Sequence, residues 1–303
     1  MLKANLVKIV QPNNESVGAQ ITALLEIFSN ARRLKKGTKI IFDFSSLQWV
    51  QPFFLLPICC LMTELKINGF NLAIIKPKNR SLEGYLDTIF FPQGFRPKLK
   101  NNVSEFLWKD FKNKTYLPII VFPAVKNENN LKIQERLLDS IYDLLSRQVK
   151  LDSVGKGAVA YLINEAVNNI CDHARVERGW LFAQYYPAKG YLDICLLDSG
   201  ISILGSYQKS NISITKDTTA IKYALSGRST KPEKGRGYGV HTSVKLLSQG
   251  LKGEFILFSG RALFYKNKNR ERLIRIPTGW RGTLVGFRIP KPLPSFNLSK
   301  YLE

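Results

Sequence analysis

The chain has few of the side chains on which metal centres and disulfide frameworks depend. Its 303 residues include two histidines, His173 and His241, and four cysteines with no C-x-x-C pair among them. Cys59 and Cys60 are adjacent within an apolar run, which is typical of reduced thiols buried in a cytoplasmic protein. The sequence therefore predicts neither a zinc site nor a disulfide-stabilised scaffold.

Long hydrophobic segments are also absent. The most apolar run, residues 52–62, is too short to span a bilayer and contains two prolines, so it predicts a buried helix. Residues 1–6 lack the apolar core of a signal peptide. We therefore expect a cytoplasmic protein without a membrane partner.

Acidic side chains are scarce relative to basic ones. Asp and Glu total 23 against 45 Lys and Arg, which gives a formal net charge of +22. A basic cluster near Tyr265 and Trp280 is suited to nucleic-acid phosphates and to base stacking. Its members are Arg261, Lys266, Lys268, Arg270, Arg272 and Arg275. An acidic protein partner fits the same charge, and so does a basic proteome or a bias toward solubility. Without helix-turn-helix or zinc-finger spacing, a nucleic-acid contact is expected to run through the phosphate backbone.

Residues 1–90 show a β–α–β–α–β pattern. Strands are predicted at 2–10, 38–44 and 70–75, and helices at 17–34 and 53–68. Asp43 at the end of a strand, the apolar helix and a hydrophobic strand after Gly69 resemble the STAS fold of anti-sigma-factor antagonists. Gln51-Pro52-Phe53 stands where the antagonists carry a phosphorylatable serine. The resemblance therefore implies a scaffold or dimerisation role rather than that switch.

Residues 91–115 are basic and irregular in pattern, with Pro92 and Pro97, and predict a connector. Residues 116–290 are expected to form an α/β (α+β) domain whose mixed sheet carries helices on one face, followed by a C-terminal tail at 291–303. Its strands are predicted at 117–122, 179–187, 191–197, 253–259 and 282–289, and its helices at 131–149, 153–174 and 240–247.

Three polar residues recur at a spacing of four within the predicted helix 153–174. Glu165, Asn169 and His173 therefore lie on one helical face. A solvated surface stripe is the ordinary alternative. The motifs that follow along the chain favour a site instead. They are Asp198-Ser199-Gly200 after a strand, Gly235-x-Gly237-x-Gly239 before a helix, and Gly282-Thr283 in the last strand.

In this order the motifs resemble the GHKL superfamily of ATP-binding domains, over roughly residues 115–290. That superfamily includes topoisomerase, chaperone and mismatch-repair ATPases, histidine kinases and anti-sigma-factor serine kinases. The resemblance implies a two-layer α/β sandwich that binds ATP and Mg²⁺. It assigns Asn169 as the metal ligand, Glu165 as the base that activates water, and His173 to the phosphates or the lid. A helix-end histidine with no ligand is an equal alternative for His173.

The same resemblance assigns the base pocket. It implies that Asp198 accepts a hydrogen bond from the adenine amino group and that Gly200 lets the backbone pass close to the base. An aspartate that only forms a turn is the alternative. Ser202 stands where the family carries a second glycine, which puts the shape of this loop in question. Thr283 completes the pocket from the last strand.

Residues 226–240 predict a lid and a phosphate-binding loop. Backbone amides of a glycine-rich turn before a helix are suited to phosphate, and the hydroxyl and basic side chains of the lid are suited to neutralising it. The assigned residues are Thr230, Lys231, Gly235, Arg236, Gly237, Tyr238, Gly239 and Val240. A solvated basic loop is the alternative.

The expected function is Mg²⁺-dependent ATP binding and hydrolysis, with the lid controlling a protein partner or a homodimer. An anti-sigma-type serine/threonine kinase and a nucleic-acid-binding regulator with structural ATP are the alternatives. A histidine kinase is disfavoured because no histidine precedes His173. A topoisomerase type is disfavoured because about a dozen residues follow Pro290, too few for a transducer domain and its lysine. Turnover is therefore expected to be slow or to depend on a partner.

Overall fold

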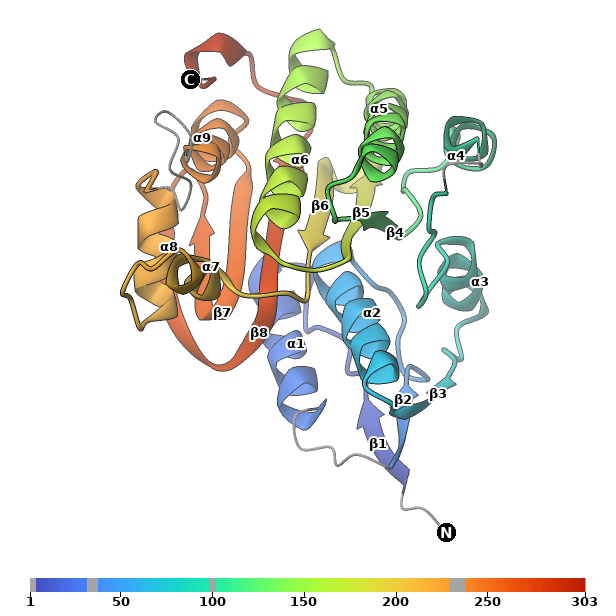
Figure 1. The fold of residues 1–303 in the computed structure, drawn as a ribbon. Helices are drawn as coiled ribbons and strands as arrows, with labels where there is room; N and C mark the ends of the chain where they lie inside the picture. The colour runs from blue at the N-terminus through green and yellow to red at the C-terminus, as the bar shows by residue number, and fades with distance from the viewer. Residues whose placement is uncertain (1–3, 32–37, 99–101, 229–237, 303) are drawn as a thin grey trace. The chain divides into compact units, whose positions relative to one another are not determined.

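The structure is a computed structural model that describes residues 4–31, 38–98, 102–228 and 238–302. The chain divides into two compact units, Met1–Phe95 and Arg96–Glu303 (Figure 1). Each unit is described by itself below. In the described part of the chain, no helix is both long enough and apolar enough to cross a membrane.

The first unit is built on a small parallel sheet. Its elements are β1 (Ala4–Lys8), α1 (Val17–Ala31), β2 (Lys39–Asp43), α2 (Pro52–Ile67), β3 (Asn71–Ile75) and α3 (Arg80–Thr88). The strands pair in the order β1-β2-β3, parallel throughout. Because such crossovers are right-handed, α1 and α2 cover the same face. The predicted β–α–β–α–β order and the buried helix that contains Cys59 and Cys60 are confirmed.

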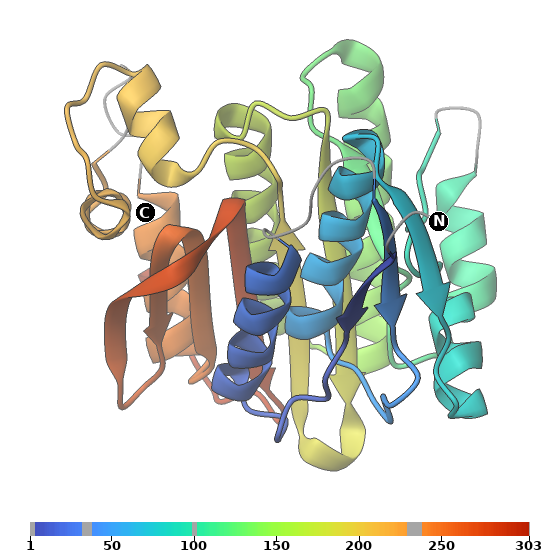
Figure 2. The ribbon, with the colours of Figure 1, turned by 90° about the horizontal axis from the view of Figure 1, so that it is seen from below.

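The second unit, Arg96–Glu303, carries most of the chain. Its main elements are α4 (Val103–Phe111), β4 (Ile120–Pro123), α5 (Glu128–Val149), α6 (Ser153–His173), β5 (Arg178–Tyr186), β6 (Tyr191–Leu197), α7 (Ile203–Lys209), α8 (Asp217–Leu225), α9 (Gly239–Lys245), β7 (Glu254–Lys266) and β8 (Glu271–Pro290). Helices α5 and α6 lie on one side of the strands (Figures 1 and 2). The predicted strands and long helices all occur in this unit; β6 has the predicted bounds, and the others have shifted ends.

Helix α4 lies within the stretch that was expected to be irregular, so that prediction was wrong for residues 103–111. The Asn102 side chain caps the helix by accepting a hydrogen bond from the Glu105 amide. Val103, Leu107 and Phe111 recur every four residues and are buried. A nine-residue helix offers only these few periodic positions, which is why the prolines and basic residues around it obscured the pattern.

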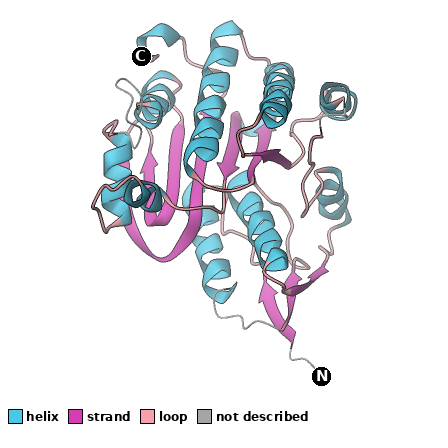
Figure 3. Cartoon of the chain, in the orientation of Figure 1, coloured by secondary structure: helices cyan, strands magenta, loops and turns pink. Residues whose placement is uncertain are grey.

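The sheet of the second unit has the order β4-β5-β6-β8-β7, and every neighbouring pair is antiparallel. The prediction of a mixed sheet was therefore wrong. Short connections account for two of the four pairs, β5–β6 and β7–β8, because parallel neighbours need a long crossover. A turn at Pro187–Lys189 joins β5 to β6. Residues 260–281, which were not assigned to strands, extend β7 and β8 into one long hairpin beside α7 and α8 (Figure 3).

A buried ion pair joins the central strands. Both guanidinium donors of Arg288 on β8, Nε and Nη2, lie 2.8 Å from the carboxylate of Asp193 on β6. Burial raises the pKa of Asp193 to about 6, although Arg288 opposes the shift. The Arg288 guanidinium also lies 4.2 Å from the centroid of the Tyr191 ring. The pair satisfies a charge that the apolar sheet would otherwise exclude.

The predicted C-terminal tail packs against the start of α6. A Cβ added at Gly155 would lie 2.5 Å from Leu293 Cδ1, and one added at Gly157 would lie 3.0 Å from Leu298 Cδ2. The two glycines therefore let the tail approach the helix backbone closely. The Asp152 side chain caps α6 by accepting a hydrogen bond of 2.7 Å from the Gly155 amide. These contacts fix the helix that carries the polar stripe.

Candidate functional site

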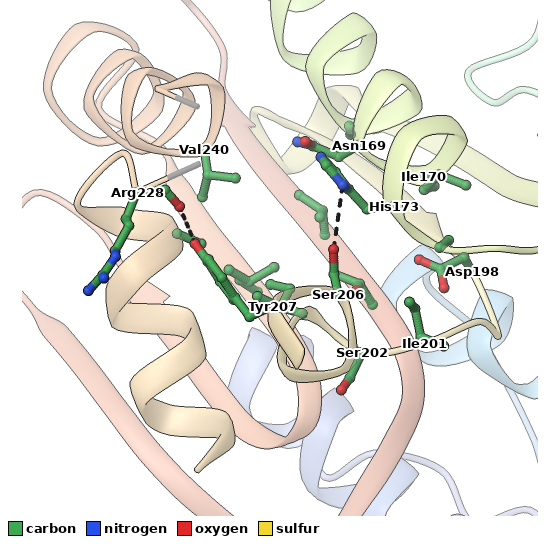
Figure 4. Close-up of a pocket in the computed structure, with 17 residues that line it drawn as sticks. Asn169, Ile170, His173, Asp198, Ile201, Ser202, Ser206, Tyr207, Arg228 and Val240 are labelled. Carbon is green, nitrogen blue, oxygen red and sulfur yellow. Dashed lines mark hydrogen bonds between the residues drawn. The ribbon is translucent and has the colours of Figure 1, made fainter. Parts of the chain in front are cut away.

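The polar stripe of α6 borders a mostly apolar cavity of about 120 Å³ in the second unit. Figure 4 shows Asn169 and His173 projecting from α6 on one side of this cavity, and Arg228 on another. Further walls come from the loop after β6, from α7 and α8, and from β7 and β8. The lining residues are Ala166, Asn169, Ile170, His173, Ala174, Asp198, Ile201, Ser202, Ile203, Ser206, Tyr207, Ala224, Arg228, Val240, Leu257, Thr283 and Val285.

The structure thus brings together six of the residues assigned from the sequence. Asn169, His173, Asp198, Ser202, Val240 and Thr283 all line the same cavity, although they lie on different elements. The cavity is smaller than the roughly 300–1,000 Å³ typical of pockets that hold a whole ligand. It is therefore suited to one ring system rather than to a complete nucleotide.

Among the described residues that line the cavity, Asp198 alone has a carboxyl group, and it is 2 % exposed. Its Oδ1 accepts a hydrogen bond of 2.8 Å from the Gly200 amide. Burial raises the pKa of Asp198 to about 7, although hydrogen bonds with the Gly200 and Thr283 backbones favour the ionised form. In the described part of the chain no ion pair compensates this carboxylate.

Two glycines and a tryptophan fix the backbone around Asp198. A Cβ at Gly200 would lie 1.9 Å from the carbonyl oxygen of Ala174. Gly282 adopts a φ of +110°, and a Cβ there would lie 2.3 Å from the Asp198 carbonyl oxygen. Trp280 Nε1 donates a hydrogen bond of 2.8 Å to that same oxygen. Only glycine permits these two backbone approaches, so Gly200 and Gly282 are both accounted for by contacts within the protein, and the approach of Gly200 to a base stays a prediction.

Ser202 has a structural task at the start of α7. Its side chain caps α7 by accepting a hydrogen bond of 3.3 Å from the Gly205 amide. The Ser259 hydroxyl lies 2.9 Å from the Ile203 amide and 3.0 Å from Thr283 Oγ1. The serine at 202 therefore starts a helix, and Ser259 ties that helix to the strand that carries Thr283.

Glu165, on α6, does not line the cavity. Its carboxylate lies against the start of α9 instead. A Cβ added at Gly239 would be 1.8 Å from Glu165 Oε2, so the carboxylate lies directly against the glycine α-carbon. Glu165 is half-buried, as is Asn169 one turn later on α6. This contact joins two of the assigned motifs and accounts for glycine at position 239 by close approach.

His173 occupies the last position of α6. Its Nδ1 lies 3.5 Å from the Ser206 hydroxyl, which is longer than an ordinary hydrogen bond. Figure 4 marks this contact across the cavity from α6 to α7. The side chain lines the cavity, so its position is compatible with either of its two predicted roles.

Five residues assigned to the lid and the phosphate loop lie outside the described residues. They are Thr230, Lys231, Gly235, Arg236 and Gly237. The two ends of this segment are described, and they meet. A Cβ at Gly227, whose φ is +75°, would lie 2.4 Å from the Tyr238 ring. His241 Nδ1 lies 2.8 Å from the Leu225 carbonyl oxygen.

The lining residues that sequence reasoning missed include Ile203, Ser206 and Tyr207 on α7, Ala224 on α8, and Arg228 just after α8. Tyr207 donates its hydroxyl to the Arg228 carbonyl, and the Arg228 guanidinium lies 4.3 Å from the Tyr223 ring centroid. Tyr207 also belongs to a small separate core with Ile214 and Ala220. The helical spacing of apolar residues in 217–225 was the available signal, but the segment is short.

The donor groups of the site decide whether it can hold a metal ion. Within the described ranges, no three His, Cys, Asp or Glu side chains form a metal-binding group. An Mg²⁺ ion needs few protein ligands, because water and phosphate oxygens complete its octahedral shell. The Asn169 amide oxygen at the cavity wall is a hard donor of the required kind. The residues present therefore fit an Mg²⁺ that arrives with a phosphate ligand.

Comparisons of the chain with family models, with curated proteins and with solved structures found no match. The architecture and the site define the class instead. The chain is a two-unit α/β protein whose larger unit holds an apolar cavity with a buried carboxylate in its wall.

Proposed function

We propose that the second unit binds Mg-ATP, with the adenine ring in the cavity beside Asp198. The observation that carries this proposal is a buried carboxylate that has no cationic partner among the described residues and lies in an otherwise mostly apolar pocket. Such a group is costly to ionise unless a ligand donates a hydrogen bond to it. The exocyclic amino group of adenine is a donor of this kind.

The cavity walls support a flat apolar ligand. Ile170, Ile201 and Val285 come from a helix, a loop and a strand, and offer aliphatic contacts to a ring. Guanine carries a carbonyl oxygen where adenine has its amino group. An ionised Asp198 would leave that oxygen unpaired and repelled, so the pocket selects adenine.

Asn169 and Glu165 supply the chemistry beyond the base. Bound Mg²⁺ neutralises phosphate charge, and the Asn169 amide oxygen is its protein ligand in this proposal. Glu165, one turn earlier, orients a water against the terminal phosphate. It takes the proton of that water on a carboxylate oxygen as the phosphorus–oxygen bond forms. The bond to the ADP oxygen then breaks, which releases ADP and inorganic phosphate.

Calorimetry with Mg-ATP tests the binding step. We expect ATP to bind and GTP to bind at least tenfold more weakly, which corresponds to about 1.4 kcal/mol. Asp198→Asn should weaken ATP binding, whereas Asp139→Asn, which removes an exposed acid on α5, should not. If the two variants bind ATP equally, Asp198 is not the base-recognising group.

The product distinguishes hydrolysis from protein phosphorylation. Labelled ATP should release free phosphate and leave the protein unlabelled if Glu165 activates water. Stable labelling of serine or threonine on the chain or on an added partner would instead establish the kinase alternative.

A further inference from the structure

A second, larger cavity lies in the same unit where the start of α8 meets the β7–β8 hairpin. Its volume is about 490 Å³. The residues that line it are Thr215, Lys216, Asp217, Thr218, Arg261 and Arg275. None of them lines the cavity that contains Asp198. The nucleotide proposal therefore leaves this second cavity unexplained.

An irregularity in the hairpin forms this cavity. Gly260 pairs with Trp280 and Ala262 pairs with Arg275, so residues 276–279 bulge opposite Arg261. The bulge places Arg261 and Arg275 in one cavity wall, although they lie on different strands. Gly260 has a φ of +57°, and a Cβ there would lie 1.9 Å from Asp217 Oδ1. The carboxylate of Asp217 therefore packs against the hairpin backbone.

The charges in the cavity are unbalanced. Lys216, Arg261 and Arg275 contribute three positive charges against one negative charge from Asp217. Over the residues that the structure describes, no ion pair or hydrogen bond engages these three basic side chains. The amides of Asp217 and Thr218 likewise make no hydrogen bond there. A multivalent oxyanion would satisfy all of these donors at once.

The surrounding hairpin indicates what carries that oxyanion. Arg270, Arg272 and Lys268 are exposed and extend the positive charge toward the hairpin tip. Arg272 and Arg275 are three residues apart on β8, about 10 Å along the strand, so their side chains leave opposite faces of it. In this part of the hairpin β7 is the only described strand that pairs with β8, so a chain of phosphates can pass around the free edge of β8 from one arginine to the other, whereas one small anion meets only the cavity. A nucleic-acid backbone, with its regularly spaced negative charges, is therefore a better occupant of the cavity than a small anion.

The aromatic residues of the hairpin do not favour base stacking. Trp280 is 7 % exposed and donates its Nε1–H to the Asp198 carbonyl. Tyr265 is half-buried, and its hydroxyl lies 2.6 Å from Glu254. The expectation that these two rings stack bases was therefore wrong. Contacts to phosphates alone remain, and these carry no sequence preference.

We propose that the cavity between α8 and the hairpin seats a phosphate of a nucleic-acid backbone, with Arg272 and Arg270 holding the phosphates that follow. The ligand chemistry is the phosphodiester of single-stranded or duplex nucleic acid. Binding is independent of base sequence and falls steeply with salt.

Fluorescence anisotropy with a labelled oligonucleotide, single-stranded and then duplex, tests this proposal on the full chain. At about 100 mM salt, the double variant R261Q/R275Q should bind roughly a hundredfold more weakly than the unmodified protein. Each lost arginine should lower the slope of log K against log salt by about 0.7 to 0.9. Arg136→Gln is the matched control, because Arg136 is exposed on α5 away from the hairpin. Arg136→Gln should change neither the affinity for the oligonucleotide nor the slope of log K against log salt.

Lys216→Gln provides a second test that leaves the hairpin unaltered. It should weaken oligonucleotide binding about tenfold with an unchanged unfolding transition. Equal effects of Arg136→Gln and R261Q/R275Q would overturn the proposal, because general charge would then explain binding. Displacement of the oligonucleotide by ATP or inorganic pyrophosphate would overturn it in favour of a small-anion site. Pocket-dependent binding of polyglutamate without oligonucleotide binding would overturn it in favour of an acidic protein partner.

Discussion

Replacement of Asp198 by asparagine should stabilise the protein at neutral and alkaline pH while it weakens ATP binding. Burial is the largest cause that raises the pKa of Asp198 from its ordinary value of 3.8 to about 7 in the folded protein. Between these values the folded protein holds a proton that the unfolded chain has lost. The contribution of Asp198 to stability is therefore fully present below about pH 4 and is lost as the pH rises through about 7.

The size of this loss follows from the shift. Each pH unit in that window changes the free energy of unfolding by about 1.4 kcal/mol for one proton. Between about pH 5 and pH 8 the native protein should therefore lose about 3 kcal/mol through this group. Asparagine does not titrate, and its amide oxygen can still accept the hydrogen bond from the Gly200 amide. The stability advantage of the variant should grow by about 3 kcal/mol over the same range.

Urea unfolding followed by tryptophan fluorescence measures this difference, with both proteins compared at each pH so that other titrating groups cancel. A constant difference between variant and unmodified protein across the pH range would refute the argument from burial. Calorimetry should show ATP affinity reduced about tenfold to a hundredfold, the worth of one hydrogen bond to a charged group. Unmodified protein should also bind ATP more weakly as the pH falls below about 7, because Asp198 is then protonated. If Asp198→Asn is more stable but binds ATP as well as the unmodified protein, the argument from burial stands and only the proposed role of Asp198 in ATP recognition is refuted.

Three further changes test the surrounding argument. Glu165→Gln should retain ATP binding and lose about 10²- to 10⁴-fold in phosphate release, and unchanged release would exclude Glu165 as the base. Gly200→Ala should lower the melting temperature of the second unit, because the methyl group meets the Ala174 carbonyl oxygen at 1.9 Å; an unchanged melting curve would show that this loop yields. Arg288→Met should cost about 3 to 5 kcal/mol in the free energy of unfolding, because it leaves Asp193 buried without its partner. That cost should fall as the pH drops toward about 6, because Arg288 lowers the pKa of Asp193 in the unmodified protein and the variant therefore takes up the proton at a higher pH; a pH-independent cost would contradict the assignment.

Sequence patterns predicted the long, periodic elements best. Helix α6 carries buried residues such as Ile163 and Val167 on faces away from Asn169, as the spacing indicated. Leu162 lies two turns before Asn169 on the same face and is buried as well. Strand β6 occupies the predicted residues, because an uninterrupted apolar run bounded by turns leaves few alternatives. The directions of neighbouring strands were not predicted, because they depend on connections whose structure was unassigned.

The cavity walls formed by α7 and α8 required the tertiary structure. Both helices are short, and each buries few residues, such as Tyr207 on α7 and Ala220 on α8. Their small shared core with Ile214 forms only when the two helices meet. The capping role of Ser202 was likewise hidden, because a serine in place of a glycine gives no sign that it starts a helix.

The two buried aspartates of the sheet show why Asp198, rather than Asp193, indicates a ligand. Asp193 and Asp198 lie five residues apart, and burial raises the pKa of both. At Asp193 the fold supplies Arg288 with two hydrogen bonds, so the charge is satisfied within the protein. At Asp198 the described structure supplies backbone hydrogen bonds and an adjoining cavity instead. The fold pairs the buried carboxylate of Asp193, five residues before Asp198, with an arginine. We therefore infer that the carboxylate of Asp198 is left for a hydrogen-bond donor that enters the cavity from outside.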